Sequence, residues 1–407
     1  MIYVSLPVHT RPAVIAGQLA NFAAFLPGAK VVLHLSANAR FTMAQLEDAL
    51  DARGCDNAIL NPQRLSTGWG NILAAHLANA AWIRRNAPGC TRICLHASND
   101  MLVRDGLGRH LARGGNFLHH RPILPGSRWR FAHAALSDMT LHAVRKRLGE
   151  VPMVGSQVEG SSYEPALLFE IADIIKHAVR QPTLLAYPRE EVWLSTVAHA
   201  RAAPIAGTPY VFSEVHRFDR AFWRVLRFVD PLLGRPGDAR WLPRRALEFL
   251  MIRSGFHRID QAWVERIAAD RADELASHEW LSDGNSNWRV FERHGLFGVK
   301  RVPRRADAPL RRYIDQLGEQ RRAQRRDQAS EQPNAQLAAQ LANQVADPLS
   351  EQSAQPGTQA GERAHDAVET GPPPGMPAQA PSSNTAPVSV SAPVPKRPLA
   401  HPPHEDR

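Results

Sequence analysis

The sequence IYVSLPVHTRPAVIAGQLANFAAFL, from Ile2 to Leu26, decides the fold of this chain. Its first part, Ile2–Val8, is a short apolar run and is typical of a buried strand. The second part, Pro12–Leu26, begins with a proline, which suits the first position of a helix. A strand followed at once by a helix is the opening of an α/β repeat.

The alternation of strand and helix continues to about residue 100. Further strands are expected at Ala29–Leu35, Asn57–Asn61 and Thr91–Ser98, and further helices at Thr42–Gly54 and Gly70–Ala87. Beyond this alternation, in a mixed middle region, a helix is expected at Glu164–Val179. This order predicts an α/β fold with a doubly wound, mainly parallel sheet. Ligands of such folds bind at the carboxyl ends of the strands, so we expect the site near residues 7–9, 36–38 and 98–100.

Two common phosphate-binding motifs are absent from the sequence. The first strand is not followed by G-x-G-x-x-G, and the chain contains no G-x-x-x-x-G-K-[ST]. A nicotinamide-dependent dehydrogenase and a P-loop NTPase are therefore not favoured. Helix N-termini can still bind phosphate through their free N–H groups.

The composition is that of a basic globular protein. The 407 residues are 44% hydrophobic and carry a formal net charge of +10. Residues 319–407 contain 8 basic and 10 acidic side chains, a net of −2, which leaves +12 on the first 318 residues. A basic folded domain favours an anionic partner, such as a phosphate-bearing small molecule, a nucleic acid or a membrane surface.

The three cysteines, Cys55, Cys90 and Cys94, do not make a disulfide framework. The sequence shows no signal peptide and no apolar run long enough to cross a membrane. We therefore expect a cytoplasmic protein, with peripheral contact to the inner membrane as a further hypothesis. The apolar segment Ala221–Leu233, with its interspersed arginines, fits either a packing helix or a helix on a membrane surface.

The composition changes after Leu317. Gln, Ala, Pro and Ser dominate from there to Arg407, and such a segment buries too little apolar area to offset the entropy of ordering it. We expect a folded domain over residues 1–317 and a disordered tail over residues 318–407. Within the tail, Gln336–Val345 has the spacing of a short, transient helix.

The sequence AYPREEVWLSTVA, from Ala186 to Ala198, places two adjacent carboxylates at the start of an amphipathic helix. One interpretation is that both are solvated and stabilised by the dipole and free N–H groups of the helix start. Successive helical residues point about 100° apart, so only one of the two is expected to face a site. Glu190 shares its stripe with apolar residues three, four and seven positions on, which makes it the better candidate for a buried general base.

Four stretches, taken in order, resemble one family of enzymes. They are LPVHTRPAVIAGQL (Leu6–Leu19), LSTGWGNILAAHLANAAW (Leu65–Trp82), GSSYEPALLFEIADII with YPREEVWLSTVA (Gly160–Ile175 and Tyr187–Ala198), and NSNWRVFERHGLFGVKRV (Asn285–Val302). Their order and spacing resemble the core-2/I-branching β-N-acetylglucosaminyltransferases, a family that includes the protein xylosyltransferases. The similarity covers roughly residues 2–317, with large gaps.

The resemblance implies a GT-A-like, nucleotide-sugar-binding fold and an inverting transfer of sugar from a UDP-sugar. It also implies that no metal is needed, because the branching enzymes lack the D-x-D motif and neutralise the departing UDP with basic side chains. This chain has Ser98, Asn99 and Asp100 at that strand end, and one carboxylate is a poor metal site. Asp100 is expected either to bind the sugar or ribose or to act as a turn residue.

The family's catalytic base is the glutamate of a Pro-Asp-Glu-like motif at a helix start, which falls on Glu190 in YPREEVW. Arg189 stands where the family has an acid, which leaves the register open by one, and Glu191 is then expected to cap the helix. The family's diphosphate-binding lysine lies in a stretch ending LF-x-x-K, which falls on Lys300, with Arg301 next to it. The alternative for this basic run is a solvated surface.

The remaining candidates depend on less specific matches. Val8, His9 and Arg11 lie where the family contacts uracil and ribose. Trp69, Glu159 and Ser161 are candidates for the sugar pocket, with a structural role as the alternative for each. The family's second phosphate-binding residue stays unassigned, since Ala276 stands at its spacing with Arg271 and His278 nearby. His110, His119 and His120 match no common metal site.

Three hypotheses for function follow. The first is a bacterial, inverting, metal-independent transferase that moves GlcNAc or xylose from a UDP-sugar to a glycan or lipid-linked glycan hydroxyl. The second is a metal-dependent GT-A transferase. The third is a non-catalytic protein whose basic surface binds polyanions, although the sequence has no nucleic-acid-binding motif and we expect no nucleic-acid partner.

Overall fold

The computed structural model describes residues 1–68, 70–125, 127, 131–179, 187–212, 259–269, 280–282, 287–289 and 296–346. The chain divides into two compact units, Met1–Gln340 and Leu341–Arg407. The fold and the site described below belong to the first unit. Of the second unit, the structure describes only residues 341–346, the last residues of a helix.

The centre of the first unit is a sheet of seven strands, counted over the described residues. In spatial order the strands are β10 (Ile205–Gly207), β6 (Asn116–Phe117), β9 (Ser162–Tyr163), β4 (Arg92–Leu95), β1 (Ile2–Val8), β2 (Lys30–Leu35) and β3 (Ala58–Leu60). The run from β3 to β4 is entirely parallel, whereas β9 lies antiparallel to both β4 and β6. The predicted doubly wound α/β fold is confirmed, with an antiparallel strand that the sequence did not indicate.

The order of the parallel strands fixes where a ligand can bind. The chain runs outward from β1 through β2 to β3 and then returns to place β4 on the other side of β1. At such a reversal the connections leave on opposite faces of the sheet and open a crevice at the carboxyl ends of the strands. The ends of β1 and β4 are therefore the first place to look for a site.

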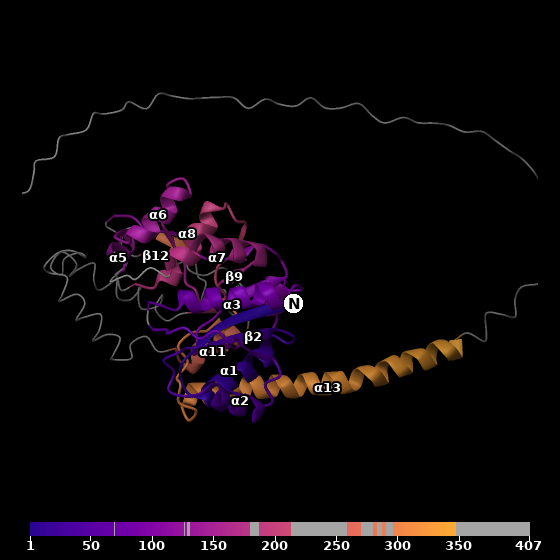
Figure 1. Cartoon of the computed structure of the whole chain (residues 1–407). Helices are drawn as coiled ribbons and strands as arrows, with labels where there is room; N and C mark the ends of the chain where they lie inside the picture. The colour runs from indigo at the N-terminus through magenta and orange to yellow at the C-terminus, as the bar shows by residue number, and fades with distance from the viewer. Residues whose placement is uncertain are drawn as a thin grey trace, which may run out of the picture. The chain divides into compact units, whose positions relative to one another are not determined.

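Helices cover both faces of the sheet. Along β2, Val31, Leu33 and Leu35 belong to a core with α1 (Pro12–Phe25) and α2 (Met43–Asp51), whereas Val32 belongs to a core with α3 (Leu73–Asn86) and α7 (Pro165–Val179). Figure 1 shows β2 between α3 on one side and α1 and α2 on the other. Since alternate strand residues point to opposite faces, a strand buried on both faces is apolar throughout, as Ile2–Val8 nearly is.

The predicted helix and strand boundaries agree with the structure to within a few residues. The strand expected at Thr91–Ser98 ends earlier, at Leu95, because the chain turns there toward Asp100. The helix expected at Thr42–Gly54 begins after Thr42, whose hydroxyl accepts from the backbone N–H of Gln45 in a capping box.

A second, three-stranded sheet brings together segments that are far apart in the sequence. Its order is β11 (Val211–Phe212), β14 (Gly298–Val299) and β5 (Met101–Leu102). β5 follows the Asp100 turn and β14 immediately precedes Lys300. This sheet therefore places Lys300 beside the carboxyl end of β4.

The other described elements are short. They are the strand pair β7 (Arg121–Pro122) and β8 (Val154–Gly155), the pair β12 (Trp280–Ser282) and β13 (Asn287–Arg289), and the helices α4 (Leu107–Leu111), α5 (Ala132–Leu136), α6 (Met139–Arg147), α8 (Arg189–Ala200) and α11 (Gln261–Ala268). None of the helices in the described part of the chain combines the length and apolar character that a membrane span requires. The segment Ala221–Leu233 lies outside the described residues.

The first part of the predicted disordered tail, residues 318–346, is helical. The helix α13 runs from Pro309 to Ala346, so residues 318–346 are helical where the composition suggested a disordered tail, and the predicted Gln336–Val345 helix is part of it. Gln, Ala, Arg and Glu are good helix formers, so a long helix is available to this sequence even with little apolar area to bury. Arg321 and Arg325 also pair with the carboxylate of Asp105. Residues 347–407 lie outside the described residues.

Candidate functional site

A tight loop between β8 and β9 positions Glu159. The side-chain amide of Gln157 donates to the backbone oxygens of Glu159 at 2.7 Å and Val211 at 2.8 Å, which ties the loop to β11. Gly160 has φ of 80°, and a Cβ there would lie 2.6 Å from the backbone nitrogen of Val211. Only glycine satisfies both the conformation and the close approach. The loop therefore holds the Glu159 carboxylate in one place.

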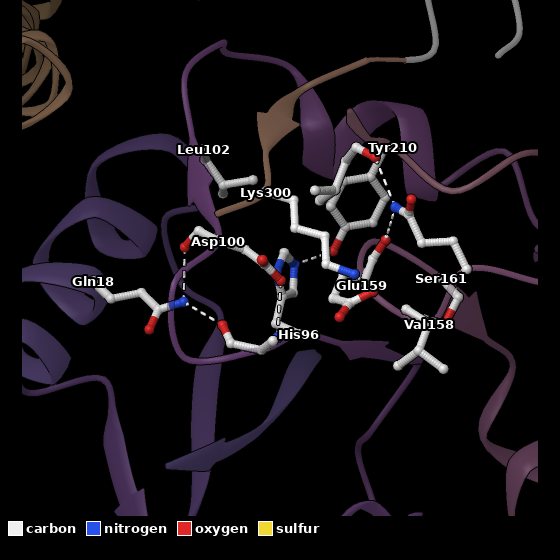
Figure 2. Close-up of polar contacts among 12 residues, drawn as sticks. Gln18, His96, Asp100, Leu102, Val158, Glu159, Ser161, Tyr210 and Lys300 are labelled. Carbon is white, nitrogen blue, oxygen red and sulfur yellow. Dashed lines mark hydrogen bonds and ion pairs between the residues drawn. The ribbon is translucent and has the colours of Figure 1, made fainter. Parts of the chain in front are cut away.

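Glu159 forms a nearly buried ion pair with Lys300. The Lys300 Nζ lies 2.6 Å from the Glu159 Oε2, and the two side chains are 13% and 10% exposed. Figure 2 shows the two side chains converging from β14 and from the loop before β9. Burial alone would raise the pKa of Glu159, but the Lys300 ammonium outweighs it and the pKa is lowered. For Lys300, burial is in turn outweighed by Glu159, so its pKa is raised and it stays charged.

Glu190 lies at the start of α8 and is 6% exposed. Burial raises the pKa of its carboxyl to about 8, the backbone N–H of Glu190 lowers it, and the charges of Glu191 and Glu159 raise it further. The Glu190 Oε2 is buried and has no hydrogen-bond partner among the described residues. A buried carboxylate with a free oxygen and a pKa near neutrality has the properties of a general base.

The burial of α8 goes further than an amphipathic pattern predicts. The apolar stripe of Glu190 is buried, as expected, but Ser195 and Thr196 on the other side are buried as well. Ser195 donates to the backbone oxygen of Val154 at 2.7 Å, and Thr196 accepts from the backbone nitrogen of Val154 at 3.0 Å. These bonds to β8 satisfy the polar side of the helix, so α8 is enclosed on all sides.

Glu191 is also part of the site, contrary to the helical-face prediction. It is half-buried, and burial raises its pKa to about 7, with Lys300, Glu159 and Arg121 among its charged neighbours. The Glu191 carboxylate interacts electrostatically with the Lys300–Glu159 pair, as Glu190 does, so two faces of the helix start contribute to the site. The predicted capping role of Glu191 stays a prediction, since the residue at the N-cap position of α8 is Pro188.

Behind the ion pair lies a buried chain of three polar side chains. The His96 Nε2 is 2.7 Å from the Tyr210 hydroxyl, and the His96 Nδ1 is 3.5 Å from the Asp100 Oδ2 (Figure 2). Asp100 is fully buried, its Oδ2 accepts from the backbone nitrogen of Ala97 at 2.8 Å, and burial raises its pKa. This geometry favours the turn role for Asp100 over contact with a sugar, since the carboxylate is enclosed.

Arg304 and His9 lie at the carboxyl ends of β4 and β1. The Arg304 Nη2 donates to the hydroxyl of Ser98 at 3.0 Å. His9 is exposed, and partial burial of its ring and the nearby charge of Arg304 lower its pKa. Arg11 is exposed at the N-cap of α1, with φ of 35°. The carboxyl ends of β4 and β1, where the strand order predicts a ligand site, are therefore flanked by basic side chains.

Other predicted site residues have structural positions. Val8 is fully buried in the core with α1, so its side chain cannot contact a nucleotide. Ser161 is also fully buried and donates to the backbone oxygen of Val158 at 2.6 Å. Arg301 is exposed next to Lys300 and has φ of 63°. Trp69, Arg271, Ala276 and His278 lie outside the described residues.

The histidines that suggested a metal do not form one cluster. His110 packs between the rings of Phe117 and Phe297, and His120 packs on the ring of His199. Over the part of the chain that the structure describes, no group of three or more His, Cys, Asp or Glu side chains is arranged to hold a metal.

Sequence reasoning missed several residues near the site. His96 and Tyr210 carry no local motif and meet only because β4 and the chain before β11 pack together. His76 is a third case: it lies on α3, its Nδ1 is 2.9 Å from the Ser5 hydroxyl, and burial lowers its pKa to about 3. The available signal for His76 was in the sequence of α3, where this histidine is followed three residues later by Asn79 on an otherwise mainly apolar helix.

Comparison with known proteins gives limited information. A scan against models of protein families finds no match, and neither does a search of curated proteins. The crystal structure of galactosyltransferase LgtC in complex with donor and acceptor sugar analogs is 11% identical, covers 53% of this chain and 77% of that chain, and gives a TM-score of 0.34.

Two further solved structures give similar values. An active-site mutant of LgtC is 10% identical over 54% of this chain and 78% of that chain, with a TM-score of 0.34. A nucleoside-diphosphate-sugar pyrophosphorylase from Vibrio cholerae RC9 is 10% identical over 51% and 91%, with a TM-score of 0.30. Similarities this low do not assign the chain to a family.

Proposed function

We propose that the protein is an inverting glycosyltransferase with a GT-A-like fold, which moves a sugar from a UDP-sugar to a hydroxyl of a glycan without a bound metal. One observation carries the proposal: the buried Glu190 carboxylate, whose Oε2 has no hydrogen-bond partner among the described residues, lies within electrostatic range of the Lys300–Glu159 pair. A base beside a fixed cation is what an inverting transfer requires. The sequence resemblance over residues 2–317 supports the same activity.

Glu190 acts as the general base in this proposal. Its Oε2 takes the proton of the acceptor hydroxyl as the oxygen attacks the anomeric carbon of the donor. The bond from that carbon to the UDP oxygen breaks on the opposite face, and UDP leaves with the electron pair. A single displacement inverts the configuration and needs no covalent intermediate. A pKa of about 8 suits a base that works near neutral pH.

Lys300 stabilises the leaving UDP. Negative charge develops on the diphosphate in the transition state, and a fixed ammonium in a water-poor site stabilises it by several kcal/mol. In the unliganded protein Glu159 holds this ammonium in place, as the ion pair indicates. Glu159 is then a positioning residue for Lys300.

The donor and acceptor are proposed from the family resemblance. GlcNAc and xylose are the expected donor sugars, and the expected acceptor is a glycan or a lipid-linked glycan at the inner face of a bacterial membrane. The charge of +12 on the first 318 residues is consistent with an anionic surface nearby. Co-sedimentation with anionic vesicles, compared with neutral ones, tests the membrane contact.

The first experiment measures thermal stabilisation by UDP in EDTA and in Mn²⁺. A ligand at about 100 times its Kd adds about 2.7 kcal/mol of stability, which is a shift of a few degrees in Tm. We expect the shift in EDTA, and we expect it to be lost in the double variant Lys300→Met with Glu159→Gln, which removes the cation without leaving a buried charge. Lys176→Ala, an exposed lysine on α7, is the control.

The outcomes separate the three hypotheses. A shift that appears only with Mn²⁺ would favour the metal-dependent transferase. Absence of a shift in every condition would contradict the UDP-sugar proposal and favour polyanion binding, which should collapse with salt. If UDP binds in EDTA, a panel of UDP-sugars follows, with the anomeric configuration of the product determined by NMR and Glu190→Gln as the inactive control.

A further inference from the structure

Arg304 is held at the carboxyl end of β4 by a contact that occupies only part of its guanidinium. It lies four residues after Lys300, and its Nη2 donates to the Ser98 hydroxyl at 3.0 Å. The loop that carries it is fixed to the same turn, because the backbone nitrogen of Val302 donates to the backbone oxygen of Asn99 at 3.0 Å. Arg311 fixes the loop a second time by donating to the backbone oxygen of Pro303 at 3.3 Å.

The Arg304 guanidinium has unused hydrogen-bonding capacity where a ligand would bind. Its Nε is buried and has no hydrogen-bond partner among the described residues. The nearby carboxylate of Asp100 attracts it electrostatically, but the Asp100 Oδ2 accepts from Ala97, and the Asp100 Oδ1, like the Arg304 Nε, has no hydrogen-bond partner among the described residues. A guanidinium carries five N–H donors in a planar fork, and a buried donor without an acceptor is rare and costly. An incoming anion would supply the missing acceptor.

The neighbouring arginine shows what a structural surface arginine looks like in the same loop. The Arg305 side chain is 73% exposed, and both its Nε and its Nη2 donate to the carboxylate of Asp307, at 3.1 and 2.5 Å. Its fork is already paired with a carboxylate in solvent. Arg304 is half-buried, lacks such a partner and points to the carboxyl ends of β1 and β4.

We propose that Arg304 is a second cation of the diphosphate subsite and binds a phosphoryl group of the nucleotide together with Lys300. The proposal rests on the proposed function and adds to it a second residue that binds the diphosphate. Two observations favour phosphate as the anion. The planar fork of arginine matches two phosphate oxygens at once. The reversal of strand order between β1 and β4 is also where α/β sheets bind nucleotides.

Lys300 and Arg304 lie at different positions in the same loop and differ in the partners they already have. Lys300 comes from the strand side of the loop and is already bound to Glu159, so a diphosphate must share it. Arg304 comes from the far side of the loop, four residues on, and has a free N–H. Both cations interact with the buried Asp100, which lies behind them. The charges of Lys300 and Arg304 therefore lie near the same turn, where one diphosphate would meet both.

The test compares binding of UDP, uridine and inorganic pyrophosphate by calorimetry in EDTA. The variants are Arg304→Gln and Arg304→Lys, with Arg305→Gln as the matched control one residue away. We expect Arg304→Gln to weaken UDP and pyrophosphate about ten- to a hundredfold, which is the usual effect of losing a hydrogen bond to a charged group. Uridine binding should not change, and Arg304→Lys should recover part of the loss, because it keeps the charge but not the fork.

Each outcome has a defined meaning. If the wild type binds UDP and Arg304→Gln, folded by its thermal transition, binds it equally well, the inference is overturned while the proposed function stands. Equal weakening of uridine would also overturn it, because the variant would then have damaged the pocket. If the wild type binds pyrophosphate through Arg304 but not UDP, the subsite stands and the UDP-sugar proposal fails. If neither ligand binds, both fail.

Discussion

The substitution Glu190→Gln tests both the burial of this carboxylate and its catalytic role, because stability and activity should change in opposite directions. A pKa raised from 4.5 to about 8 means that ionising Glu190 in the folded protein costs about 5 kcal/mol at about 1.4 kcal/mol per pH unit. The folded state binds the proton more tightly than the unfolded state, so wild-type stability falls as pH rises from about 4.5 to about 8. Glutamine has the same shape and does not ionise.

The variant should therefore gain stability with pH relative to the wild type. We expect almost no difference at pH 4, about 2 kcal/mol at pH 6 and about 5 kcal/mol above pH 8.5, measured by urea unfolding. Over the same range the variant should lose about two to four orders of magnitude in activity. Glu47→Gln, an exposed glutamate on α2, is the matched control and should show no such trend.

Two results would refute the reasoning. A stability difference that stays constant from pH 5 to pH 9 would mean that the Glu190 carboxylate is not buried as a charge. If Glu191→Gln loses the activity while Glu190→Gln keeps it, the family's catalytic glutamate corresponds to Glu191 and not to Glu190. Glu191, with a pKa of about 7, is then the base. If Glu190 is the base, Glu191→Gln should instead lower the pKa of Glu190, because the charge of Glu191 raises that pKa. The pH profile of the activity should then shift to lower pH.

Three further predictions concern the same site. The value of kcat/KM should rise with pH and level off above about pH 8, because Glu190 must be ionised to act as the base. At pH 7 it should be about a tenth of its plateau value. A value of kcat/KM that does not change with pH would contradict this. Lys300→Met should cost about 3–5 kcal/mol in urea unfolding because it leaves Glu159 buried and unpaired, and adding Glu159→Gln should recover most of the loss; no recovery would mean that the pair is not buried as charges. Gly160→Ala should cost about 2–5 kcal/mol, because its Cβ would meet a backbone nitrogen of β11. Gly149→Ala, with a similar φ but open space around its Cβ, should cost about 1–2 kcal/mol, so equal losses would show that only the backbone conformation matters.

Some of the site could be predicted because its residues carry a local signal. Glu190 follows a proline and opens a helix whose apolar stripe it shares, and in the structure that stripe is buried. Lys300 lies in a sequence motif, and Glu159 directly precedes another, although nothing in either motif indicated that the two residues form an ion pair. The errors arise where a side chain's environment depends on other segments. Val8 was expected near the nucleotide, but its side chain points into the core with α1.

The sequence alone determined the order of strands and helices, because apolar periodicity and proline and glycine positions act within a few residues. Ile2–Val8, the helix after it and the alternation to residue 95 required nothing else. Only the tertiary structure decided which charges meet. The Lys300–Glu159 pair, the half-used guanidinium of Arg304 and the raised pKa of Glu190 depend on desolvation and on contacts between distant segments. Desolvation and contacts between distant segments arise from three-dimensional packing, and neither produces a periodic pattern in the sequence.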